Sequence, residues 1–126
     1  MSIAVKTEMK GGIRHCRPQD MTFQDVDVYG CVMAKAPIFE GDHAVRSAYF
    51  RMKTGDVIAK HRHRKWVQVM VISGHIRVEQ KGADLFFAGP GELYFLEPGF
   101  DHVETAMEET LLVVTQGEDR PGWARD

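Results

Sequence analysis

The chain has 126 residues, with 16 lysines and arginines against 18 aspartates and glutamates, so its formal net charge is −2. This length predicts one domain (residues 1–126) that can bury a core without needing a disulfide or a metal. The near-neutral charge and the sequence pI of about 6.3 argue against a nucleic-acid-binding protein, which usually has a basic surface. No apolar stretch approaches the ~20 residues of a membrane span. We therefore expect a small-molecule partner, and neither nucleic acid nor membrane.

Cysteine spacing and the N-terminal residues indicate the compartment. Cys16 and Cys31 form no CxxC pair, which is typical of free thiols in a reducing environment. Residues 1–12 contain no apolar run of the kind found in a signal peptide. The sequence therefore predicts a cytoplasmic protein.

Short apolar runs that end at glycine or proline fill most of the chain. An N-terminal arm is expected over residues 1–20, a β-rich core over about 29–115, and a polar C-terminal tail over 117–126. The most distinct strands are expected at 44–53, 66–72, 75–80, 85–88, 93–96, 103–106 and 110–115. Such a rhythm favours an all-β sandwich or barrel. It does not distinguish immunoglobulin-like, lipocalin-like and jelly-roll arrangements.

The residue pattern with the clearest chemistry is His61-Arg62-His63. In an extended segment, two histidines separated by one residue point to the same side, so both imidazoles can reach one ion. A third histidine, His102, follows a Pro-Gly turn at the start of an expected strand. Three imidazoles on one face leave open positions on a metal ion, and metal-dependent catalysis requires such positions.

These two segments resemble the two sequence motifs of the cupin superfamily, in order and in spacing. The matching residues are Gly55, His61, His63 and Gly74 in the first motif, and Gly91, Gly99 and His102 in the second. The resemblance extends over about 48–114. It implies a cupin double-stranded β-helix, which is a jelly-roll barrel with a metal in its mouth. The side chains that we expect to line that barrel include Phe50, Met52, Val69, Val71, Leu93 and Phe95.

The chain departs from the cupin motifs at the residue that most affects the metal. The glutamate of the first motif falls at Val67, which cannot bind a metal. The resemblance therefore implies a ligand set of His61, His63 and His102, with a neutral fourth ligand or none. The candidates for a fourth ligand are first Gln68, one residue later, and then Glu79 in the following strand.

Glu104 is a further candidate because it lies two residues after His102 and therefore on the same side of the expected strand. We consider it as a hydrogen-bond acceptor for a ligand or as a general base. The plainer alternative is a charge on the rim of the barrel.

A three-histidine cupin site without the glutamate resembles the small non-heme iron dioxygenases that cleave acetylacetone or dihydroxyacetophenone. Neutral imidazoles leave the ion its full charge, so an enolate or phenolate binds as an anion. The resemblance implies one divalent ion, with Fe²⁺ favoured and Zn²⁺, Ni²⁺ and Mn²⁺ open. It also implies a homodimer. The alternatives are a Lewis-acid isomerase, cyclase or lyase, and a non-catalytic cupin that binds a small ligand.

Overall fold

The computed structural model of the chain describes residues 12–40, 44–80, 83 and 85–119. Within these residues, strands dominate and one short 3₁₀ helix (Pro18–Asp20) precedes them. The strands are β1 (Gln24–Val28), β2 (Cys31–Phe39), β3 (Arg46–Met52), β4 (Val57–His61), β5 (Lys65–Ser73), β6 (Ile76–Gln80), β7 (Phe86–Ala88), β8 (Leu93–Leu96), β9 (His102–Ala106) and β10 (Thr110–Asp119). The all-β prediction is confirmed.

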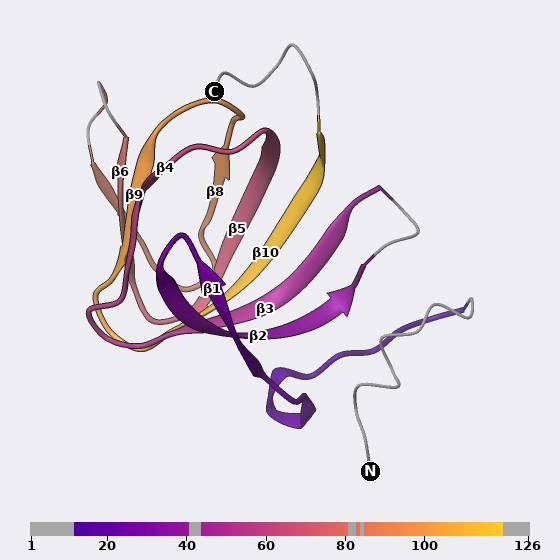
Figure 1. Cartoon of the computed structure of the whole chain (residues 1–126). Helices are drawn as coiled ribbons and strands as arrows, with labels where there is room; N and C mark the ends of the chain where they lie inside the picture. The colour runs from indigo at the N-terminus through magenta and orange to yellow at the C-terminus, as the bar shows by residue number, and fades with distance from the viewer. Residues whose placement is uncertain (1–11, 41–43, 81–82, 84, 120–126) are drawn as a thin grey trace.

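The strands form two antiparallel sheets that face each other across the interior (Figure 1). The larger sheet has six strands in the order β1-β2-β3-β10-β5-β8, and the smaller has four in the order β4-β9-β6-β7. The four motif glycines predicted to mark the turns, Gly55, Gly74, Gly91 and Gly99, all have positive φ angles, from 84° to 91°. No helix in the described ranges is long and apolar enough to cross a membrane.

At both ends the strands extend beyond the predicted core of about 29–115, because β1 begins at Gln24 and β10 ends at Asp119. Strand β1 starts before residue 29 and joins β2 through a two-residue turn, Tyr29-Gly30, in which both φ angles are positive. The expected arm contacts β3 at Cys16, whose carbonyl oxygen lies 3.5 Å from the Tyr49 hydroxyl. Positions 1–11 of the arm and 120–126 of the tail lie outside the described residues.

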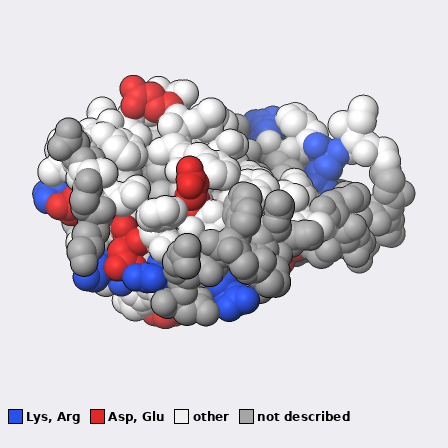
Figure 2. Space-filling view, turned by 90° about the horizontal axis from the view of Figure 1, so that it is seen from above, with Lys and Arg blue, Asp and Glu red and all other residues white. Residues whose placement is uncertain are grey.

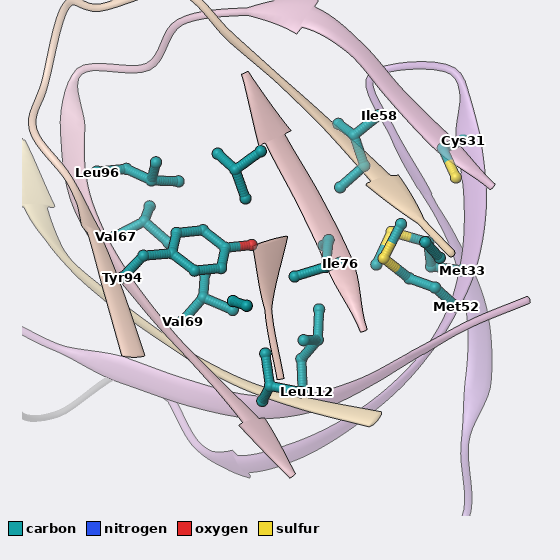
Figure 3. Close-up of a cluster of buried hydrophobic side chains, with 14 residues drawn as sticks. Cys31, Met33, Met52, Ile58, Val67, Val69, Ile76, Tyr94, Leu96 and Leu112 are labelled. Atoms are coloured by element: carbon teal, nitrogen blue, oxygen red, sulfur yellow. The ribbon is translucent and has the colours of Figure 1, made fainter. Parts of the chain in front are cut away.

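The core fills the space between the sheets and comes from alternate residues of the strands (Figure 3). On β5, Val67, Val69 and Val71 are buried, whereas the side chains between them are exposed. Phe50, Met52, Val69 and Val71 pack in or against this core, as predicted. Apolar side chains from both sheets therefore enclose the interior of the barrel.

Strand β8 faces the opposite way from our expectation. Leu93 and Phe95 are 57% and 52% exposed, whereas Tyr94 and Leu96 are buried. The pairing explains the difference, because Tyr94 lies opposite the inward-facing Val69, and cross-strand partners share a face. Every residue of Leu-Tyr-Phe-Leu is apolar or aromatic, so the sequence pattern of this strand does not identify its buried side.

Candidate metal site

His61 and His102 are cross-strand partners in the smaller sheet. Strand β4 pairs with β9 as Ile58 opposite Glu104 and then as His61 opposite His102, with a register shift between the two pairs. One extra residue on β4 absorbs this shift, so His61 rather than Lys60 stands opposite His102. This β-bulge turns the His61 side chain to the same side as His102.

His63 lies just beyond β4, where two contacts hold its loop against the loop that precedes β9. The Gly99 N–H donates to the His63 carbonyl oxygen at 3.0 Å. The Arg62 guanidinium donates to both carboxylate oxygens of Asp101, at 2.8 Å and 3.3 Å. A bidentate pair of this kind fixes orientation as well as distance. The two motif segments are therefore joined at the residues next to the histidines.

The structure brings the three predicted histidines together. The ring centroid of His102 lies 4.2 Å from that of His61 and 5.0 Å from that of His63. One ring nitrogen from each of the three residues lies within 4.8 Å of the others. This spacing is a little wider than that of nitrogens bound to one ion at ~2.1 Å, so a small inward movement of the side chains places all three around a metal.

The hydrogen bonds of the imidazoles determine which nitrogen faces the cluster. Nδ1 of His61, His63 and His102 lies 2.6, 2.7 and 3.0 Å from the carbonyl oxygens of Ala59, Lys65 and Phe100 respectively. A carbonyl only accepts, so each Nδ1 carries the proton and each neutral ring keeps a lone pair on Nε2. Metal-bound histidines in proteins usually have this arrangement.

Burial keeps these rings neutral. It lowers the pKa of His63 to about 4 and lowers the pKa of His61 and of His102 below the ordinary value of 6.5. The neighbouring imidazoles add to the effect, because a second positive charge beside the first is unfavourable. All three rings are therefore unprotonated near neutral pH, which is the form that binds a metal.

Glu104 is also part of this cluster. Its side chain is buried, with Oε1 3.6 Å from Nε2 of His102 and 3.9 Å from Nε2 of His61. Its Oε2 accepts a 2.5 Å hydrogen bond from the hydroxyl of Tyr94. Burial raises the pKa of Glu104, while the Tyr94 hydrogen bond acts in the opposite direction. Of the roles considered for Glu104, the structure excludes an exposed charge on the rim.

The donor set fits a metal cation. Three Nε2 lone pairs and a carboxyl oxygen converge on one region, and all are electron-pair donors when Glu104 is ionised. Within the described part of the chain, Nε2 of His102 is buried and has no hydrogen-bond partner. Buried polar atoms are rarely left unpaired. A bound cation would satisfy this nitrogen and remove the repulsion among the converging lone pairs.

The two candidates for a fourth ligand lie elsewhere. Gln68 is on the exposed face of β5, with Val67 and Val69 on the buried side, so it does not reach the cluster. Glu79 is on the outer face of β6, where its carboxylate pairs with Arg77 at 3.0 Å. Both expectations are wrong for the same reason: a one-residue step along a strand reverses the face of the sheet.

Tyr29 and Tyr94 contact the cluster, and neither was predicted from the sequence. The Tyr29 ring stacks on His61 with ring centroids 4.1 Å apart and an interplanar angle of 20°. Tyr94 points into the barrel interior (Figure 3). Its hydroxyl donates a hydrogen bond to Glu104. The only sequence signal for Tyr94 was a polar hydroxyl within an otherwise apolar strand, and for Tyr29 a Tyr-Gly pair at a turn.

A cavity of about 280 Å³ adjoins the histidines. Its wall is mostly apolar and includes Val67, Val69, Phe50 and Leu112, while His61, His63 and Glu104 supply polar groups. This volume is close to the lower end of the roughly 300–1,000 Å³ found for small-molecule sites. Trp66 is not part of this wall, because its ring stacks on Phe95 outside the barrel, with centroids 5.7 Å apart.

A family model described as the ChrR cupin-like domain matches residues 13–119. The chain belongs to this cupin family. The match includes all three histidines and Glu104, so the cluster lies within the family domain. No curated protein matches the chain.

Solved cupin structures share the fold. The polyketide cyclase RemF from Streptomyces resistomycificus matches with a TM-score of 0.75 and 16% identity, covering 87% of this chain and 82% of RemF. An RmlC-like cupin from Shewanella frigidimarina has a TM-score of 0.69 and 16% identity, with 92% and 100% covered. A predicted oxalate decarboxylase from Thermotoga maritima has a TM-score of 0.70 and 12% identity, with 81% and 96% covered. The jelly-roll prediction is therefore confirmed.

Proposed function

We propose that this cupin is a metal-dependent enzyme that binds one divalent cation through His61, His63 and His102. The observation that carries the proposal is the convergence of three unprotonated Nε2 atoms, each oriented by an Nδ1–H bond to a backbone carbonyl. The cation would supply positive charge to bind and polarise an oxygen of the substrate. The protein's own groups orient the ligands and enclose the site within an apolar wall.

The proposed substrate is a small carbonyl or phenolic compound. The cavity admits a molecule of modest size, and its lining combines an apolar wall with charged side chains, among them Lys35 and Arg46. On the face displayed in Figure 2, the basic side chains of the described residues are scattered, several of them beside acidic ones, and they form no continuous basic area. This distribution supports a small-molecule partner rather than a nucleic acid.

The reaction that we propose first is oxygen-dependent C–C cleavage with Fe²⁺ in the site. Its support is the set of three neutral imidazoles, which leaves the charge of the ion available to an enolate or phenolate. The second candidate is a Lewis-acid reaction without oxygen, such as an isomerisation, cyclisation or elimination. The buried Tyr94–Glu104 pair beside the cluster favours it, because such reactions need a group that holds a proton near the substrate.

Metal analysis and oxygen uptake separate these candidates. The protein is purified without added metal, its metal content is measured, and oxygen consumption is followed with β-diketones and hydroxyacetophenones. Bound iron together with substrate-dependent oxygen uptake supports the first reaction. Bound zinc with substrate conversion under anaerobic conditions supports the second and contradicts the first. Saturable binding of these compounds without turnover under either condition identifies a ligand-binding cupin and contradicts both.

We also propose that two copies of the chain associate. The outer face of β5 and β8 carries four exposed apolar side chains that a second copy would cover, namely Met70, Ile72, Leu93 and Phe95. Light scattering after gel filtration tests this: we expect twice the 14.3 kDa chain mass, and a single chain mass in the Leu93→Ser/Phe95→Ser variant. A wild-type protein of single chain mass at micromolar concentration contradicts the proposal.

The cytoplasmic location stays a prediction, and both described cysteines are free thiols.

A further inference from the structure

Glu104 lies within the histidine cluster, on the side that its spacing from His102 predicted. It lies on β9 two residues after His102, on the same inward face, and is 5% exposed. Its Oε1 is nearly equidistant from two of the three metal-binding nitrogens, at 3.6 Å from His102 Nε2 and 3.9 Å from His61 Nε2. These separations resemble those among the imidazole nitrogens themselves, which lie within 4.8 Å of one another.

The carboxyl group is oriented by a second residue. The hydroxyl of Tyr94 on β8 donates a hydrogen bond to Oε2 of Glu104 at 2.5 Å. This bond directs Oε1 toward the histidines. The position of Tyr94 is fixed in turn by its pairing opposite Val69 in the larger sheet. A hydrogen bond that spans the barrel interior therefore aims one carboxyl oxygen at the cluster.

The contacts of Oε1 with the histidines are not hydrogen bonds. Each imidazole donates from Nδ1 to a backbone carbonyl, so the neutral rings present bare Nε2 atoms to Glu104. Distances of 3.6 Å and 3.9 Å are also too long for hydrogen bonds. A carboxylate oxygen facing two nitrogen lone pairs in a buried site is unfavourable unless a cation lies between them or the carboxyl group is protonated.

The position of the motif glutamate on β5 is occupied by an apolar side chain. Val67 stands at that position on β5, is 7% exposed, and lines the same cavity as His61 and Glu104. The β5 wall therefore contributes a valine where the motif has a carboxylate. The buried carboxyl group next to the histidines comes from β9 instead.

We propose that Glu104 is the fourth protein ligand of the metal, replacing the glutamate that the first cupin motif supplies from β5, and that Tyr94 positions it. This inference rests on the proposed metal site and extends it to three imidazoles and one carboxylate. With this ligand a bound divalent ion has a net charge of about +1 rather than +2. The full-charge argument for the oxygen-dependent reaction and the proton-holding role of Glu104 in the second candidate therefore apply only to a three-histidine site. A carboxylate from β9 also leaves the Val67 side of the site apolar and open to the cavity.

The test compares three variants by metal affinity and by infrared spectroscopy. Affinity for Zn²⁺ is measured by competition with a chromophoric chelator, and the metal-bound minus metal-free infrared spectrum reports the carboxylate stretches. We expect Glu104→Gln to weaken Zn²⁺ binding by about 100-fold or more and to remove the carboxylate bands from the difference spectrum. Tyr94→Phe should weaken binding by about 10-fold, within the range for a group that orients a ligand, while keeping those bands at shifted positions. The control Glu79→Gln, on the outer face, should match the wild type in both measurements.

A rescue variant gives a further readout. Val67→Glu/Glu104→Gln returns a carboxylate to the β5 position, so we expect it to recover most of the affinity that Glu104→Gln loses. The proposal is overturned if the wild-type difference spectrum lacks carboxylate bands, or if Glu104→Gln binds Zn²⁺ with wild-type affinity. If Glu104→Gln does not fold, the wild-type infrared spectrum decides alone. Loss of Zn²⁺ binding in His102→Ala tests the three-histidine site separately, so failure of one claim is distinguishable from failure of the other.

Discussion

His61 on β4 and His102 on β9 stand directly opposite each other across an antiparallel pair, with ring centroids 4.2 Å apart and an interplanar angle of 68°. They belong to motifs that are separated along the chain, and the sheet pairing brings them together. The bulge before His61 is essential, because a regular register would put Lys60 in its place. The site therefore depends on sheet register as much as on residue identity.

The two faces of β5 give a direct mutational test of this register. Val67→Glu places a carboxylate on the inner wall, so we expect it to raise metal affinity and to destabilise the metal-free protein by roughly 1–3 kcal/mol or more. The matched control Gln68→Glu adds the same group one residue later on the exposed face, and it should change neither quantity. Metal competition and urea unfolding with and without metal measure the effects. Equal behaviour of the two variants would mean that Val67 does not face the ion.

Tyr29 lies in the turn between β1 and β2, and its ring stacks on the proposed metal ligand His61. Tyr29 has a positive φ of 49°, which asparagine adopts more readily, but its ring stacks on His61. We expect Tyr29→Asn to keep or raise the thermal midpoint of the metal-free protein while weakening metal binding about two- to tenfold, the equivalent of one aromatic contact. Tyr29→Phe keeps the stacking and should bind metal normally. A Tyr29→Asn protein with wild-type affinity would show that the stacking does not orient His61.

Several features of the site follow from local sequence and others do not. The motif glycines predicted the turns, and the spacing of His61 and His63 predicted their shared side. The outward face of Gln68 follows from strand alternation only once the register is known, and a bulge is not visible in the sequence. The Tyr94–Glu104 hydrogen bond joins strands of different sheets, so no local pattern indicates it.

Acid should destabilise the metal-free protein through His63. Its pKa is about 4 in the folded protein and 6.5 without the fold, so between these values the unfolded chain binds more protons. The stabilising contribution is fully present above about pH 6.5 and is lost as the pH falls toward 4. Urea unfolding at several pH values measures this loss, and His63→Gln should reduce the slope.

Protonation of Glu104 has the opposite effect on folding stability over part of this pH range. Its pKa is raised above 4.5, so its contribution to stability is present at low pH and is lost as the pH rises through the raised value. Glu104→Gln removes that opposing contribution. We therefore expect a steeper loss of stability on acidification in Glu104→Gln than in the wild type. A shallower loss would contradict a raised pKa for Glu104 in the folded protein.

The central claim is that three histidines from two distant motifs hold one metal ion. The most direct measurement is the metal content per chain, by elemental analysis, of wild type and His102→Ala purified side by side without added metal. His75→Ala, at an exposed histidine just before β6 that pairs with Glu108, is the matched control. We predict close to one divalent ion per chain in the wild type and in His75→Ala, and almost none in His102→Ala. Equal metal content in His102→Ala and the wild type would contradict the account.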